Sequence, residues 1–139
     1  MSERLFRIGI ITDTHVRSPA GDQSSPYPVN DKANARAAYA ARLLAEQQPD
    51  VVVHLGDMVH PLPHMSAYAP ACEEALKLFA PLGESIHYVS GNHDTGDKPM
   101  PASPASGVDD AAIARYQQYF GRQYYKVQVE NIALLVINS

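Results

Sequence analysis

The sequence contains little cysteine and no concentration of positive charge. Cys72 is the single cysteine among 139 residues, which excludes an intrachain disulfide and a metal site built from thiolates alone. We interpret Cys72 as a small buried hydrophobic residue and expect a reducing compartment. The 11 lysine and arginine residues are scattered and the net charge is -4, so we expect no binding to nucleic acid or to an anionic membrane.

Long apolar runs and phosphate-binding glycine motifs are also missing. Charges at Glu3, Arg4 and Arg7 interrupt the amino terminus, and no run is long enough for a signal sequence or a membrane span. We therefore expect a cytoplasmic protein. Because neither Gly-x-x-x-x-Gly-Lys nor Gly-x-Gly-x-x-Gly occurs, a nucleotide-binding module ranks last among the possible functions. The length and a hydrophobic content of 45% predict one domain, residues 1–139.

Apolar runs alternate with helical segments along the chain. Buried strands are predicted at residues 5–12 and 50–55 and a third, short strand at 86–89. Helices are predicted at 31–48, 71–80 and 109–120, with Asn30 or Asp31 capping the first. This alternation favours an α/β fold with a mostly parallel sheet. Two further strands, 124–129 and 132–137, are predicted to form a hairpin, and residues 16–30 and 95–107 are predicted to be loops.

Polar residues follow each of the three predicted parallel strands. Asp13 and His15 follow the first, Asp57 follows the second, and residues 92–94 follow the third. Ligands of open α/β sheets bind where loops leave the carboxyl ends of strands, so we expect these side chains to converge. In extended geometry Asp13 and His15 point to the same side and can hold one ion, and oxygen with imidazole suits Fe, Mn, Co or Zn.

The other two segments can complete a site with two metals. Asp57 has two carboxylate oxygens, which is enough to bridge two ions, and the preceding Gly56 lets the backbone turn sharply. Asn92 offers a neutral carbonyl oxygen. His93 comes next in sequence and faces elsewhere, so it can reach a substrate while Asp94 orients it.

The three polar segments are Asp13-Thr14-His15, Gly56-Asp57 and Gly91-Asn92-His93-Asp94. They resemble the first three motifs of the calcineurin-like metallophosphoesterase family. The stretches GNHDTGDKP and YYKVQVENIALLVINS are similar to the branch that contains cyclic-nucleotide phosphodiesterases. The resemblance covers the whole chain. It implies the amino-terminal part of a four-layer α/β/β/α sandwich.

The resemblance also implies a function and a role for each residue. A metal-bridging hydroxide would hydrolyse a phosphomonoester or phosphodiester, either a small molecule or a phosphoprotein, with two divalent ions of Fe, Mn or Zn. The metal ligands would be Asp13 and His15 for the first ion, Asp57 as the bridge and Asn92 for the second. His93 and Asp94 would contact the ester.

The sequence departs from the family pattern in two places. The later motifs, a lone His and then Gly-His-x-His, do not occur before Ser139, so we expect a weak second metal site and an apparently truncated domain. The purple acid phosphatase branch has a tyrosine where this chain has His60, so no tyrosinate-ferric colour is expected. The alternative function is a catalytically silent fragment or pseudoenzyme that self-associates through the exposed edge of strand 132–137.

The remaining histidines have less specific contexts. His54 and His87 lie in or beside predicted strands, where a core or sheet-face histidine is the simpler interpretation. His60 and His64 lie in the loop after Asp57, where they could line a substrate pocket or simply face solvent. Neither pair is predicted to bind metal.

Overall fold

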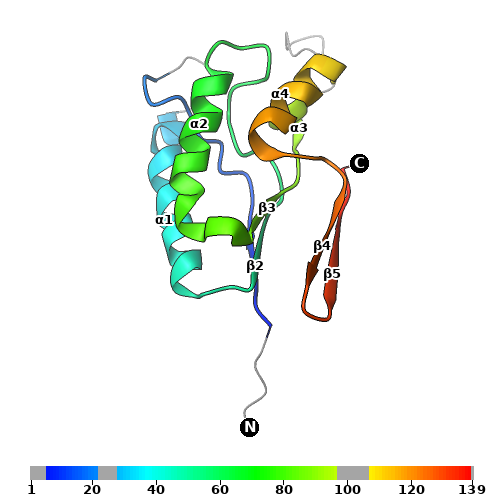
Figure 1. The fold of residues 1–139 in the computed structure, drawn as a ribbon. Helices are drawn as coiled ribbons and strands as arrows, with labels where there is room; N and C mark the ends of the chain where they lie inside the picture. The colour runs from blue at the N-terminus through cyan, green and yellow to red at the C-terminus, as the bar shows by residue number, and fades with distance from the viewer. Residues whose placement is uncertain (1–5, 22–27, 97–106, 139) are drawn as a thin grey trace.

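The computed structural model describes residues 6–21, 28–96 and 107–138 and contains helices and strands in alternation. Leu5 and the central parts of the two predicted loops, 22–27 and 97–106, lie outside the described residues. The elements are β1 (Ile8–Ile11), the 3-10 helix η1 (Pro28–Lys32), α1 (Ala33–Glu46), β2 (Val51–His54), α2 (Tyr68–Phe79), the 3-10 helix η2 (Ala80–Ser85), β3 (Ile86–Tyr88), α3 (Asn92–Thr95), α4 (Asp110–Phe120), β4 (Tyr125–Val129) and β5 (Ile132–Val136) (Figure 1).

A three-stranded parallel sheet organises the fold. Its order is β1-β2-β3, with Ile8 paired to Val51 and Val52 paired to Ile86. Helices α1 and α2 lie on one side of this sheet, and the β4–β5 hairpin lies on the other (Figure 1). The predicted α/β class, the parallel sheet and the antiparallel hairpin are confirmed.

The hydrophobic core lies between the sheet and its helices. Tyr68, Cys72 and Phe79 of α2 are buried against residues of β1, β2 and α1, so the interpretation of Cys72 as a buried hydrophobic residue is confirmed. One strand differs from the prediction. Ile8 and Ile10 of β1 are 47% and 62% exposed, because β1 is an edge strand and the helices cover only one of its faces.

Two helix starts also differ from their predictions. Helix α2 begins at Tyr68, three residues earlier than expected, because Pro70 falls in the first turn, where the missing N–H costs no helical hydrogen bond. Helix α1 begins at Ala33, and neither predicted cap serves it. Asn30 and Asp31 belong to η1, and the Asp31 carboxylate pairs instead with Arg17 at 2.6 Å.

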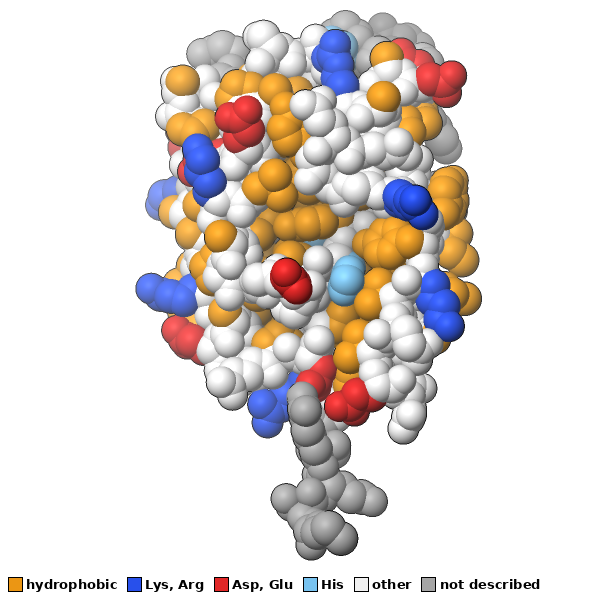
Figure 2. Space-filling model, in the orientation of Figure 1, with side chains coloured by type: hydrophobic (Ala, Val, Ile, Leu, Met, Phe, Trp, Pro, Cys, Tyr) orange, Lys and Arg blue, Asp and Glu red, His pale blue; other side chains and the backbone are white. Residues whose placement is uncertain are grey.

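The β4–β5 hairpin is attached to the parallel sheet through β3. The Tyr125 hydroxyl donates to the Tyr88 carbonyl at 2.9 Å. Figure 2 shows hydrophobic side chains gathered across the middle of the face that is turned to the viewer in Figure 1. Tyr88, Phe120 and Tyr125 line a groove where β3, α4 and β4 meet. Within the described residues β5 pairs only with β4, and its Leu135 is 69% exposed. Self-association through this edge stays a prediction.

No described helix combines the length and the apolar character needed to cross a bilayer.

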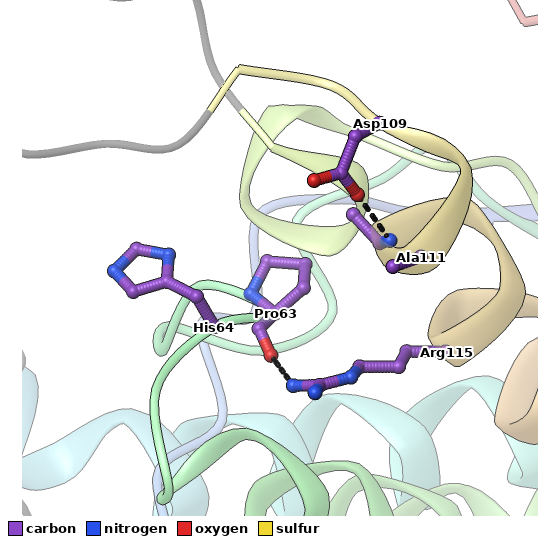
Figure 3. A pocket seen from close by; sticks show the side chains of 6 residues that line it. Pro63, His64, Asp109, Ala111 and Arg115 are labelled. Carbon is purple, nitrogen blue, oxygen red and sulfur yellow. Dashed lines mark hydrogen bonds between the residues drawn. The ribbon is translucent and has the colours of Figure 1, made fainter.

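Helix α4 holds the long loop that follows β2. Asp109 caps the helix by accepting from the Ala112 N–H at 2.7 Å, as its place before the helix favours. The guanidinium of Arg115, the sixth residue of the helix, donates to the Pro63 carbonyl (Figure 3). The loop between β2 and α2 is thereby attached at a point close to the polar residues that follow β2.

Candidate metal centre

The residues that follow β1 and β2 adopt an uncommon backbone conformation. Asp13, His15 and Asp57 have positive φ angles of 52°, 46° and 53°. Such angles are rare outside glycine and concentrate at functional sites. The extended geometry expected for Asp13 and His15 is therefore wrong, yet their side chains do lie on the same side, with His15 Nε2 3.9 Å from Asp13 Oδ1.

The loops after β1 and β2 run side by side beyond the ends of the strands. The His15 N–H donates to the Asp57 carbonyl at 3.0 Å, and the Val16 N–H donates to the Met58 carbonyl at 2.8 Å. The pairing continues as a parallel bridge between Val16 and Val59. Because the two loops keep a fixed register, the side chains of the two motifs face the same space.

Asp13, His15 and Asp57 form a group that could hold one metal ion. Their ligand atoms lie within 4.8 Å of one another, and His15 Nε2 is 3.7 Å from Asp57 Oδ2. Atoms bound to one ion at the usual 2.0–2.2 Å stand about 3–4 Å apart, so the separations fit with small side-chain movements. Oxygen and imidazole donors suit Fe, Mn or Zn.

Two glycines allow the loops after β2 and β3 to touch through their backbones. A Cβ on Gly56, which has φ +109°, would lie 2.7 Å from the Gly91 nitrogen. A Cβ on Gly91 would lie 2.2 Å from Asp57 Oδ1. In this close contact the His93 N–H donates to Asp57 Oδ1 at 3.0 Å, which leaves Oδ2 directed at His15.

Asp94 lies beneath this contact instead of facing a substrate. Its side chain is fully buried and accepts backbone N–H groups of Asp57 at 2.7 Å, Met58 at 3.0 Å and Gly91 at 2.8 Å. Burial raises the pKa of Asp94 to about 7, against the opposite effect of the hydrogen bond from Gly91. The structure thus places Asp94 away from the ester-facing position expected from the sequence, where it holds the loops together.

Asn92 and His93 open α3, a single turn that the sequence analysis did not predict. Asn92 is exposed. It follows Gly91, which lies against the Asp57 backbone. Its role as a ligand of the second metal stays a prediction. His93 is partly buried, and its Nδ1 contacts the carbonyl of His60. Because a carbonyl only accepts, Nδ1 carries a proton and Nε2 is the nitrogen available for chemistry.

His60 belongs to the same cluster of side chains, which the sequence left open. Its Nδ1 lies 3.3 Å from His15 Nδ1, and its ring centroid is 4.9 Å from that of His93. The pairing of the loops explains this position, since the His60 N–H donates to the Val16 carbonyl at 2.9 Å. In the sequence, the signal for this position of His60 was its short spacing from Asp57. His64, in contrast, lines a separate hollow with Asp109 and Arg115 (Figure 3).

The titration of His15 favours its metal-binding form. Burial and the neighbouring His93 lower its pKa, and together they outweigh the carboxylates of Asp57 and Asp13, which raise it. The neutral imidazole, which has a free lone pair, is therefore favoured at neutral pH.

His54 is a core residue, as its place within a strand predicted. It is fully buried and accepts the Gly56 N–H at Nδ1, while Nε2 lies 3.0 Å from Thr14 Oγ1. The Thr14 hydroxyl then donates to the Met58 carbonyl, so Nε2 carries the proton. Burial lowers the pKa of His54 to about 4. His87 is partly buried on the sheet face near the Tyr125 ring.

Comparisons with known proteins identify a family and two similar proteins. A family model described as calcineurin-like phosphoesterase matches residues 6–138. The serine/threonine-protein phosphatase CPPED1 of Bos taurus is 30% identical over 94 residues, which are 66% of this chain and 27% of that protein. A crystal structure of a dimetal phosphatase from Danio rerio shares 22% identity with a TM-score of 0.44, over 65% of this chain and 30% of that chain. The chain spans less than a third of the length of either relative.

Proposed function

Because the chain belongs to the calcineurin-like phosphoesterase family, we propose that it contributes the metal-binding and leaving-group residues for metal-dependent hydrolysis of a phosphomonoester or phosphodiester. The observation that carries this proposal is the group formed by Asp13, His15 and Asp57, with ligand atoms within 4.8 Å. Residues 1–139 would act as a single unit of the α/β/β/α sandwich.

The donor set suits two divalent ions that share Asp57. Asp13 and His15 would hold the first ion together with Asp57 Oδ2, which already faces His15 at 3.7 Å. Asn92 would hold the second ion with Asp57, a pair of protein ligands that predicts weak binding. When bound, two such ions would activate water for attack near neutral pH and would stabilise negative charge on the phosphoryl oxygens.

His93 is the residue proposed to act on the leaving group. The His60 carbonyl fixes the proton on Nδ1 and orients the ring, so that Nε2 can donate to the leaving oxygen when the ring is protonated. Asp94 is a positioning residue in this scheme, because it acts through the backbone of Gly91 and Asp57.

Turnover of nitrophenyl phosphate and bis-nitrophenyl phosphate by this chain, with Mn²⁺ or Zn²⁺ supplied, tests the proposal. We expect His93→Ala to lower kcat by about 10²–10⁴-fold, the usual contribution of a general acid, and Asp57→Asn to abolish turnover. His64→Ala is the control, since its ring lies outside the cluster. Unchanged turnover in His93→Ala would contradict the assignment. No turnover by the unaltered chain would favour the silent pseudoenzyme, which the weak second site makes the second candidate.

A further inference from the structure

Three histidine rings meet beside the group that Asp13, His15 and Asp57 form, and His15 belongs to both clusters. Ligand atoms of His15, His60 and His93 lie within 4.8 Å of one another. The ring centroids are 5.2 Å apart for His15 and His60, 4.8 Å for His15 and His93, and 4.9 Å for His60 and His93. All three side chains are partly buried and come from the loops after β1, β2 and β3.

The two nitrogens of His15 face different partners. Nε2 lies near Asp13 and Asp57, at 3.9 and 3.7 Å, whereas Nδ1 lies 3.3 Å from Nδ1 of His60. Two nitrogens bound to one tetrahedral zinc ion at the usual 2.0–2.1 Å stand about 3.3 Å apart. The contact between His15 and His60 therefore has the spacing of two imidazoles that share an ion.

The contact of the third ring, His93, with the His60 carbonyl engages one of its two nitrogens. His93 Nδ1 is engaged by the His60 carbonyl, so its neutral ring has the free lone pair on Nε2. A carbonyl that holds the second nitrogen of a ligating histidine is the usual arrangement around protein-bound metals, because it fixes the tautomer and the ring plane. Here the residue that holds His93 is itself the second ligand.

We propose that His15, His60 and His93 form a binding site for one zinc-class ion with three imidazole ligands. It shares His15 with the site that Asp13, His15 and Asp57 form, but its other two donors are imidazoles, and His60 lies in none of the three sequence motifs. Imidazole donors favour Zn²⁺, Cu²⁺, Ni²⁺ or Co²⁺ over Mg²⁺ and Mn²⁺, which prefer oxygen. The inference concerns ion binding alone, and it stands or falls independently of hydrolysis.

Sharing His15 makes the two modes of binding exclusive. A neutral imidazole has one lone pair, so His15 can bind an ion through Nε2 with the carboxylates or through Nδ1 with His60. Oxygen-preferring ions should take the first mode and nitrogen-preferring ions the second. Variants that alter one mode without the other can therefore separate them.

Titration with Co²⁺, followed by its visible absorption and by Zn²⁺ competition, tests the proposal without any assay of activity. We expect tetrahedral Co²⁺ absorption in the unaltered chain and binding more than about 100-fold weaker in His60→Ala, since losing a residue that only supports a ligand costs roughly 10–100-fold. The matched control His64→Ala, whose ring lies outside both groups, should bind Co²⁺ as the unaltered chain does. Circular dichroism checks that each variant is folded.

A second measurement uses only the unaltered chain. On addition of Zn²⁺, the ¹⁵N resonances of the His15, His60 and His93 rings should all move, and those of His54 and His64 should not. The proposal is overturned if Asp13→Asn abolishes binding while His60→Ala retains it, or if only His15 responds to Zn²⁺. A loss in His60→Ala of 100-fold or less would assign His60 to support of His15 and would equally overturn it.

Discussion

At the scale of single residues, Asp94 shows how a motif residue can serve the site without touching substrate. Its carboxylate collects N–H groups from the loop after β2 and from Gly91, at distances of 2.7 to 3.0 Å. The Tyr68 hydroxyl also donates to its carbonyl at 2.7 Å. The N–H groups of Asp57 and Met58 bond to Asp94 in a buried environment, and that of Gly91 in a partly buried one, so these N–H groups depend on Asp94 for a partner.

We predict that Asp94→Asn destabilises the protein although it preserves the volume of the side chain. An amide places an NH₂ group where an oxygen stood, and either orientation turns donors toward backbone donors. The expected loss is about 2–3 kcal/mol of unfolding free energy, measured by urea denaturation followed by circular dichroism. The control is Asp109→Asn, which should change stability by only a few tenths of a kcal/mol, because Asn and Asp cap helices equally well. Equal stability of Asp94→Asn and the unaltered chain would contradict this role.

The family motifs indicated the first group of ligands but not every neighbour. The sequence predicted that Asp13, His15 and Asp57 converge, and the structure brings them together. It did not predict that Asp94 is buried or that His60 joins His15. Both depend on the register between two loops, set by pairs such as Val16 with Val59, and such long-range pairing leaves no periodic signal.

At the scale of elements, strand and helix types followed from the pattern of residues, whereas several boundaries did not. Helix α4 begins where Asp109 predicted, because its cap is a local interaction. Helix α1 begins later because Asp31 pairs with Arg17, 14 residues earlier in the chain. Competition between a local cap and a distant cation cannot be read from neighbouring residues.

Gly91→Ala tests the contact between the loops after β2 and β3. Gly91 has φ -101°, which any residue can adopt, so the glycine is required by space alone. The added Cβ would lie 2.2 Å from Asp57 Oδ1 and 2.6 Å from the Asp57 nitrogen, so Asp57 must move. We expect a loss of about 1–3 kcal/mol of unfolding free energy, as for other overpacked sites, together with weaker Mn²⁺ binding measured by calorimetry.

Gly83→Ala is the matched control for this experiment. Gly83 has φ +59° and nothing within 4 Å of an added Cβ, so alanine there adds backbone strain without a clash. It should cost about 1–3 kcal/mol through this strain and leave Mn²⁺ binding unchanged. Mn²⁺ binding by Gly91→Ala equal to that of the control would show that the close contact does not position Asp57.

At the scale of the whole molecule, the site depends on three loops that leave one edge of the parallel sheet. The alternation of strands and helices in the sequence was sufficient to predict where this edge lies. His54 links the loops on the core side. Its ring connects Gly56 to Thr14, and Thr14 in turn reaches Met58. The chain of hydrogen bonds needs a neutral ring with one donor and one acceptor.

This requirement makes global stability depend on pH. The pKa of His54 is lowered from 6.5 to about 4 by burial, so between these values the unfolded chain binds a proton that the folded chain does not. Unfolding free energy should therefore fall as pH falls through this window, by up to about 3 kcal/mol from His54 alone. Urea denaturation at a series of pH values between about 7 and about 4.5 measures the decline.

A variant isolates the part of this decline that belongs to His54. His54→Gln keeps a donor and an acceptor but no titrating ring, so its stability should fall less steeply over the same range, although it is lower at neutral pH. His64→Ala removes an exposed histidine and should keep the full slope. Carboxylates and His15 titrate in every variant, so the difference between the His54→Gln curve and that of the unaltered chain reports His54 alone. Parallel curves would mean that the hydrogen-bonded ring is protonated without loss, and that the three loops are held by the contacts of Asp94 and Gly91 instead.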